Sequence, residues 1–247
     1  MSGRWDATTY DRIADPQARW GAAVLDRLPL RGDERVLDAG CGSGRVTELL
    51  AEQLPHGHVV ALDASPDMLA AARHRLERFG DRVSFIQADL GRPLPSSVGR
   101  VAGVLSTATF HWVLDHDALF RHLAAVLDPG GLLVAQCGGD GNVATLERAV
   151  EALGIGRRGE FVFATAEETA EHLRAAGFNE IRTWLVDEPT TFEPGPPFDR
   201  FVETVCLRAM LERLPSGERA RAVQAVIDHL PGAALDYVRL NIVARRA

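Results

Sequence analysis

Short apolar runs rich in β-branched residues alternate with longer segments of helical spacing along the first half of the chain. Continuous apolar runs favour strands buried on both faces, and apolar residues that recur every three or four positions favour helices packed on a sheet. Alternation of this kind builds a parallel sheet covered by helices on both faces. The pattern predicts strands at 35–37, 58–62, 83–88, 101–105 and 132–135, and helices at about 46–54, 65–79 and 116–127.

The two ends of the chain have looser patterns. Residues 1–30 place aromatic side chains in polar sequence before one helical pattern, which favours a lid over a strand. We expect one α/β domain over 1–247, with a mostly parallel sheet of seven strands, an N-terminal helical lid (1–30), a core (31–137) and a final half with a helical cap (138–247). After Cys137 the spacing predicts helices at 142–153, 166–176, 198–214 and 217–230, strands at 180–186 and 235–244, and a proline-rich linker at 189–197.

Composition narrows the class of protein. At 247 residues, with 46% hydrophobic and 25% charged residues, the chain suits one well-buried globular domain. The net charge of −7 disfavours a nucleic-acid partner, although solubility alone also accounts for an acidic balance. A polar N-terminus and the lack of long apolar runs disfavour a membrane protein. Three widely spaced cysteines fit a reducing compartment and lack metal-ligand spacing, so we expect a cytoplasmic protein without a structural metal.

A glycine-rich turn follows the first predicted strand. Residues 36–44 read Val-Leu-Asp-Ala-Gly-Cys-Gly-Ser-Gly, and helical spacing resumes at Val46. Glycine suits a turn whose backbone angles other residues avoid and whose bare main chain touches a ligand. Asp63 ends the second predicted strand 19 residues after Gly44, where a carboxylate accepts hydrogen bonds from ribose hydroxyls. The turn, the spaced acid and the two strands together predict a nucleoside site.

The glycine spacing bears on which nucleoside cofactor binds. The dinucleotide fingerprint has its third glycine inside the helix, whereas position 45 of this chain is Arg. This disfavours a nicotinamide oxidoreductase, a class that an NAD titration would detect. The chain has Gly40-x-Gly42-x-Gly44 instead, with Asp38 two residues ahead of the first glycine.

That pattern resembles motif I of the class I methyltransferases that use S-adenosylmethionine (SAM). Within this family the chain most resembles the trans-aconitate methyltransferase-like group of small-molecule enzymes, with the malonyl-carrier-protein methyltransferases as near relatives. The resemblance implies a Rossmann-like fold and SAM as the cofactor, and it is strongest over about residues 30–137. Further matching segments are Leu-Asp-Ala-Ser-Pro-Asp-Met-Leu at 62–69, Gln-Ala-Asp-Leu at 87–90, 106–113 and Leu-Asp-Pro-Gly-Gly at 127–131.

The resemblance implies a role for each motif residue. The turn would lie under the methionine and ribose of SAM, with Asp38 holding the ammonium group and Asp63 the ribose hydroxyls. Met68 would pack on adenine and Asp89 would accept from its exocyclic amine, although Met68 also suits a plain core position and Asp89 a turn cap. The implied cofactor-binding set is Tyr10, Arg19, Asp38, Gly40, Cys41, Gly42, Gly44, Asp63, Ala64, Met68, Ala88, Asp89, Leu90, Ser106 and Thr107.

The segment 106–112 follows the fourth predicted strand at the edge where such sheets bind ligands, so we expect it to face the transferred methyl group. Methyltransferases acting on amides or bases usually carry an Asn/Asp-Pro-Pro-aromatic motif there. Ser-Thr-Ala-Thr in this chain fits a small oxygen or carbon nucleophile instead. His111 is the candidate catalytic residue, as a base for a hydroxyl acceptor or as a polar contact; a ring merely packed beside Trp112 is the plain alternative.

The N-terminal segment is the expected lid. In the resembled group a tyrosine and an arginine nine residues apart fold over the SAM site, and Tyr10 and Arg19 share that spacing. Tyr10 and Trp20 are equally suited to packing the first helix onto the domain. Arg157 and Arg158 are candidates for receiving an anionic substrate, or a solvated surface pair. The predicted substrate-binding set is Tyr10, Trp20, His111 and Trp112.

These observations lead to a SAM-dependent methyltransferase acting on a small molecule, by O-methylation of a carboxylate through direct in-line transfer. A carboxylate is already ionised at pH 7 and needs no base. One alternative is a hydroxyl- or carbon-directed methyltransferase of secondary metabolism with His111 as the base. Another is a SAM-binding partner protein that has lost catalysis, which SAM binding without turnover would reveal. The sequence leaves the oligomeric state open.

Overall fold

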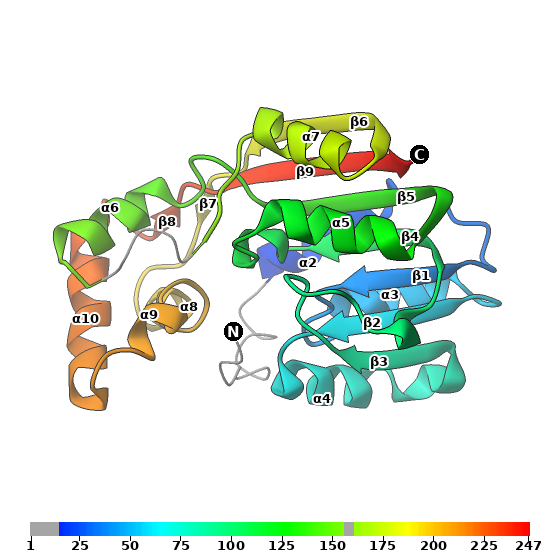
Figure 1. Ribbon diagram of the computed structural model, residues 1–247. Coiled ribbons are helices and arrows are strands. Elements are labelled where there is room, and N and C mark those ends of the chain that lie inside the picture. Colours follow the sequence, from blue (N-terminus) through cyan, green and yellow to red (C-terminus); the bar gives the residue numbers. More distant parts are fainter. Residues whose placement is uncertain (1–14, 156–160) are drawn as a thin grey trace.

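A seven-stranded sheet forms the centre of the computed structural model, which describes residues 15–155 and 161–247 (Figure 1). Its strands lie in the order β3-β2-β1-β4-β5-β9-β6, and β9 runs antiparallel to both of its neighbours while the other pairings are parallel. The Rossmann-like, mostly parallel sheet is therefore confirmed. The strands are β1 Arg35–Ala39, β2 His58–Asp63, β3 Val83–Gln87, β4 Val101–Thr107, β5 Leu127–Gly138, β6 Phe178–Asp187 and β9 Val238–Arg246.

Helices cover both faces of this sheet, because successive strand residues point to opposite sides. Val36 belongs to the apolar cluster under α2, α3 and α4, and Leu37 to the cluster under α5 and α7. The predicted helix start at Ser65 is confirmed, since Ser65 Oγ accepts the Met68 N–H at 3.3 Å. These helices are α2 Asp15–Leu25, α3 Arg45–Gln53, α4 Pro66–Arg75, α5 His116–Val126 and α7 Ala166–Ala175.

A helical cap stands beyond the carboxyl ends of the parallel strands (Figure 1). It has its own apolar cluster, which buries Phe201, Val226 and Leu235 together with Trp20 of α2. No helix in the described part of the chain is long and apolar enough to cross a membrane. The cap elements are α6 Ala144–Ala152, β7 Thr190–Thr191, α8 Pro196–Phe201, a π-helical turn Val202–Cys206, α9 Arg208–Leu211, α10 Ser216–His229 and β8 Ala234–Leu235.

Two predicted helices are shorter or more broken than their spacing indicated. The helix expected over 65–79 ends at Arg75 and passes into a 3₁₀ segment, Glu77–Arg82, in which Gly80 has a φ of 53°. The helix expected over 198–214 is interrupted by the π-helical turn between α8 and α9. In both places the apolar spacing continued through a change of backbone geometry.

The structure corrects three further boundaries. Asn142, the first residue of the helix expected over 142–153, lies outside that helix: its Oδ1 accepts the Val238 N–H at 3.1 Å, and α6 begins after Val143. The Asp-Pro-Gly-Gly stretch at 128–131, between the predicted helix at 116–127 and the predicted strand at 132–135, lies inside β5, where the β4–β5 register shifts. The linker expected over 189–197 contains β7 and the start of α8.

Candidate active site

The glycine-rich turn folds over the carboxyl end of β2. The N–H groups of Gly40 and Cys41 donate to the Leu62 carbonyl oxygen at 2.8 and 2.9 Å, and the Gly42 N–H donates to Asp63 Oδ2 at 2.9 Å. Gly42 has a φ of 54°, and a side chain there would meet open space. The turn therefore presents uncovered main chain next to the Asp63 carboxylate.

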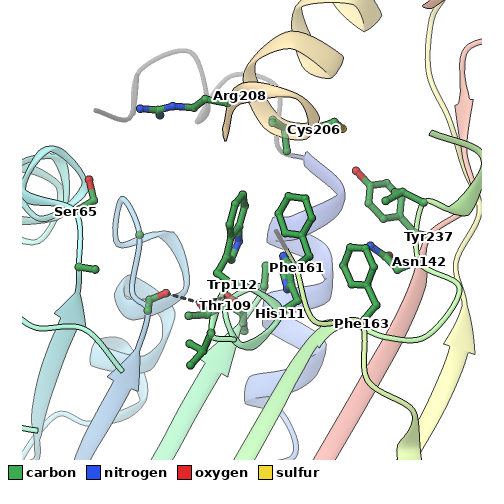
Figure 2. Close-up of a pocket in the computed structure, with 18 of the residues that line it drawn as sticks. Ser65, Thr109, His111, Trp112, Asn142, Phe161, Phe163, Cys206, Arg208 and Tyr237 are labelled. Atoms are coloured by element: carbon green, nitrogen blue, oxygen red, sulfur yellow. Dashed lines mark hydrogen bonds between the residues drawn. The ribbon is translucent and has the colours of Figure 1, made fainter. Parts of the chain in front are cut away.

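A cavity of about 930 Å³ opens beside this turn, at the carboxyl ends of β1, β2 and β4. Its size is within the usual range for small-molecule sites. In Figure 2 the rings of Trp112, Phe161 and Phe163 lie between Ser65 on one side and Tyr237 on the other. The predicted cofactor residues that line the cavity are Gly40, Cys41, Gly42, Asp63, Ala64, Met68, Ala88, Asp89, Leu90 and Thr107.

Two carboxylates line the cavity near the turn. Asp63 Oδ1 accepts the Ser65 N–H at 2.8 Å, and burial raises the pKa of Asp63 against the lowering effect of its backbone hydrogen bonds. Asp89 Oδ1 accepts the Gly91 N–H at 2.8 Å, so Asp89 caps a turn and also lines the cavity wall. Each carboxylate oxygen has a second lone pair, which allows both groups to accept a ligand hydrogen bond as well.

Asp38 lies behind the turn and is fully buried. Its Oδ2 accepts the Thr47 hydroxyl at 2.7 Å, while Oδ1 has no hydrogen-bond partner among the described residues. Burial raises the pKa of Asp38 to about 7, with the Thr47 bond opposing the rise and the Asp63 charge adding to it. A buried acceptor without a partner is costly, and an ammonium group is a donor that would satisfy it. Asp38 therefore fits the ammonium-holding role that motif I implies for SAM, directly or through a water.

Other predicted cofactor residues support the cavity without lining it. The Ser106 hydroxyl donates to the Ala39 carbonyl oxygen at 2.6 Å, which ties β4 to β1. Gly44 allows a close approach to α4, because a side chain there would meet Ala72 and Leu76 at 3.1–3.2 Å. Ser106, Gly44 and Asp38 do not line the cavity, so Ser106 and Gly44 lie in supporting positions and Asp38 reaches the site from behind the turn.

The N-terminal predictions are only partly visible. Tyr10 lies outside the described residues, as do Arg157 and Arg158, and Arg19 is described only as part of α2. Trp20, expected to contact substrate, is instead buried in the cap cluster and does not line the cavity. Its ring packs edge-on against Tyr237, with 5.1 Å between centroids.

The chain turns sharply after β4. Ala108 has a φ of 54°, in the left-handed region that few residues other than glycine adopt, and its N–H donates to the Gln136 carbonyl oxygen at 2.7 Å. This turn brings Thr109 Oγ1 to 3.2 Å from the Gly40 carbonyl oxygen. Backbone strain of this kind is typical of functional sites, and here it fixes the segment that carries His111.

His111 lies in the cavity wall within a group of aromatic rings. Its ring centroid lies 5.5 Å from that of Trp112, 6.1 Å from Phe161 and 5.8 Å from Phe163. The Gly138 N–H donates to His111 Nδ1 at 3.3 Å, which assigns the proton of the neutral ring to Nε2. Burial, together with the nearby charges of Arg239 and His116, lowers the pKa of His111 to about 3. At neutral pH His111 is thus a hydrogen-bond donor.

The part of the cavity nearer the cap is lined by residues that the sequence did not single out. Arg239 is the residue among them with a recognisable signal, because it is a charged residue between the apolar Val238 and Leu240 of a predicted strand. The three cysteines are free thiols, and the described residues contain no metal-ligating group of three or more side chains. The newly found lining residues include Asn142, Leu146, Phe161, Phe163, Cys206, Arg208, Met210, Tyr237 and Arg239.

The fold and the site together define a Rossmann-like protein with a nucleoside-type cofactor site, whose cavity continues under a cap. A family model described as a methyltransferase domain matches residues 36–131. Trans-aconitate 2-methyltransferase of Methylobacterium radiotolerans is 30% identical over 267 residues, which cover 98% of each chain. The enzyme of the same name from Methylobacterium nodulans is 37% identical over 183 residues, 73% of this chain and 67% of the relative.

A solved structure has the same fold. Haemonchus contortus phosphoethanolamine N-methyltransferase 2, in complex with phosphomonomethylethanolamine and S-adenosylhomocysteine, superimposes with a TM-score of 0.65 at 20% identity, covering 97% of this chain and 56% of that one. The chain belongs to the class I SAM-dependent methyltransferases, in the trans-aconitate methyltransferase group. The predicted family, enzyme class and cofactor are thereby confirmed, and the oxidoreductase alternative is set aside.

Proposed function

We propose that this methyltransferase transfers the methyl group of SAM to a carboxylate oxygen of a small-molecule acid. The observation that carries the proposal is the state of His111: a neutral ring in the cavity wall whose Nδ1 is held by the Gly138 N–H. Such a ring donates a hydrogen bond and is a poor base, and a carboxylate is an oxygen acceptor that requires no base. Two relatives are named for trans-aconitate, which is a carboxylic acid.

Bound SAM supplies a methyl group on a positively charged sulfur, and the carbon–sulfur bond breaks as the new carbon–oxygen bond forms. The chain contributes position and a dry environment. Phe161 stacks on Phe163 at 5.5 Å and meets the Trp112 ring at 4.6 Å, so an apolar wall excludes water around His111. Correct alignment of the reacting atoms accounts for roughly 7–11 kcal/mol of a barrier. The Nε2–H of His111 holds and orients the carboxylate.

Four residues hold the cofactor in this proposal. Asp63 accepts the ribose hydroxyls at the end of β2, and Asp89 accepts the exocyclic amine of adenine. Met68, buried in the first turn of α4 and part of the cavity wall, packs on the adenine ring. The open Oδ1 of Asp38 receives the methionine ammonium, directly or through a water.

The test is the chemical nature of the product. Purified protein is incubated with SAM and a panel of acids that includes trans-aconitate, each paired with the alcohol of the same carbon skeleton. We expect a methyl ester, which mild alkali hydrolyses, from acids and no product from the alcohols. An alkali-stable methyl ether or a carbon-methylated product would refute carboxylate methylation and favour a hydroxyl- or carbon-directed enzyme.

A further inference from the structure

Arg239 is a buried cation in the cavity wall for which the methyl transfer itself has no use. It is the second residue of β9 and is 4% exposed. Opposite it in the β5–β9 ladder stands Gly138, the residue whose N–H holds His111. The guanidinium charge also lowers the pKa of His111, so the two side chains share one electrostatic environment.

The guanidinium of Arg239 lies on the side of the cavity nearer the cap. Its central carbon is 4.6 Å from the centroid of the Trp20 ring, and Trp20 in turn packs against Tyr237. A guanidinium that lies over a ring keeps its N–H groups in its own plane, from which they can engage an anion in a fork. Behind it, Arg239 Nε lies 3.5 Å from Gln136 Oε1, and Gln136 Nε2 donates to Asn241 Oδ1 at 2.8 Å. This buried polar network fixes the position of the arginine.

The sheet order sets a distance between this cation and the methyl-transfer point. The glycine turn follows β1 and the His111 segment follows β4, whereas Arg239 stands on β9, two strands beyond β4. Neighbouring strands are about 4.8 Å apart, so β4 and β9 are separated by roughly 10 Å. The His111 ring contacts the Gly138 N–H on β5, the strand between β4 and β9, so it lies on the side of the site that faces Arg239.

We propose that Arg239 is a specificity-determining residue: it anchors a carboxylate of the acceptor that is not methylated, while the reacting carboxylate lies beside His111. This inference rests on the proposed function for its kinetic readout. A carboxylate gripped by a guanidinium fork in a water-poor cavity is strongly held and shares its negative charge with that partner. It is thereby a good anchor and a poor nucleophile, which assigns the transfer to the other end of the molecule.

The experiment compares diacids with their half-amides. Wild-type protein, Arg239→Gln and Arg239→Lys are assayed with SAM and with α,ω-diacids from succinate to suberate, trans-aconitate, and the monoamide of each straight-chain diacid. We expect Arg239→Gln to raise the KM for diacids tenfold or more and to leave the values for the monoamides within threefold. Arg239→Lys, which retains the charge without the fork, should fall between. Arg245→Gln is the matched control, because Arg245 lies on the same strand but pairs with Glu180 outside the cavity.

Binding measurements separate this inference from the proposed function. Calorimetry with S-adenosylhomocysteine should give the same affinity for wild type and Arg239→Gln, and melting temperatures check that the variant is folded. If wild type methylates none of the acids, the proposed function fails, and diacid binding to the S-adenosylhomocysteine complex still tests Arg239. Equal losses on diacids and monoamides, or diacid affinity unchanged by Arg239→Gln, would overturn the anchoring role. So would the absence of any diacid binding to wild type.

Discussion

Replacing Asp63 tests the cofactor half of the site most directly. Asp63 stands at the end of β2 with Oδ1 on the Ser65 N–H and Oδ2 on the Gly42 N–H. It therefore both lines the cavity and holds the glycine turn. Asp63→Asn keeps the shape and one carbonyl acceptor but loses the charge, whereas Asp63→Ala removes every acceptor. Asp63→Asn thus removes the charge and one of the two backbone hydrogen bonds, and Asp63→Ala removes both.

The magnitude follows from the hydrogen bonds that are lost. A hydrogen bond to a charged group contributes about 1.5–3 kcal/mol, and 1.4 kcal/mol is a factor of about ten in affinity. Loss of one charged acceptor for the ribose therefore weakens SAM binding by at least about tenfold in Asp63→Asn. Asp63→Ala leaves both the Ser65 and the Gly42 N–H groups without their acceptor, so its loss should exceed that of Asp63→Asn.

Titration calorimetry with SAM and with S-adenosylhomocysteine measures these affinities, and circular dichroism checks that the variants are folded. Asp67→Asn provides a matched control, because Asp67 lies in the first turn of the same α4 helix and does not line the cavity. We expect the control to bind SAM like wild type. Affinities within threefold of wild type for both Asp63 variants would refute this account of the ribose site.

Three further outcomes concern buried groups. The pKa of His111, about 3, is below the ordinary 6.5, so below about pH 6.5 the unfolded chain binds more protons than the folded one and the free energy of unfolding should fall. Urea denaturation of wild type and His111→Gln at a series of pH values measures this, and an equal pH dependence of stability in the two proteins would contradict it. The pKa of Asp38, about 7, is above the ordinary 3.8, so the stability that protonated Asp38 contributes is lost as pH rises from about 4 to 7. Asp38→Asn should flatten this pH dependence of stability and weaken SAM binding. An unchanged SAM affinity would count against the ammonium-holding role of Asp38. Phe120 is fully buried in α5, so Phe120→Ala should lower the free energy of unfolding in chemical denaturation by about 3–5 kcal/mol. A loss under about 1 kcal/mol would show that the core closes over the cavity.

The cofactor half could be predicted from the sequence because its signals are local. β1 and β2 are buried on both faces and therefore appear as apolar runs, and the glycine turn sits directly between β1 and α3. Ser65 followed by Pro66 marked a helix start that the structure confirms. In each case the residues that make the feature are neighbours in the chain, so their spacing carried the geometry.

Spacing alone gave a wrong prediction where the backbone geometry changes within a regular apolar pattern or where a distant segment binds a side chain. Apolar residues at helical intervals run through Val202–Cys206, yet the backbone there widens into a π-helical turn without any Gly or Pro to mark it. Asn142 has the residue type of an N-cap, but a strand far along the chain supplies the Val238 N–H that its side chain accepts. A tertiary partner decided the outcome, and no local pattern announces such a partner.

The acceptor half of the site lies where the family resemblance fades, because tertiary partners assemble it. SAM is common to the family, so the groups that hold it can be encoded in short shared motifs, whereas an acceptor must be recognised by whatever the cap brings together. Arg239 comes next to His111 only because β9 inserts between β5 and β6 in the opposite direction. Trp20 joins them from the other end of the chain by packing under the guanidinium. With Arg239 as the proposed anchor, substrate choice would depend on segments that meet only in the folded sheet, and a substitution at Arg239 would change it while the proposed cofactor contacts of the glycine turn and Asp63 stay in place.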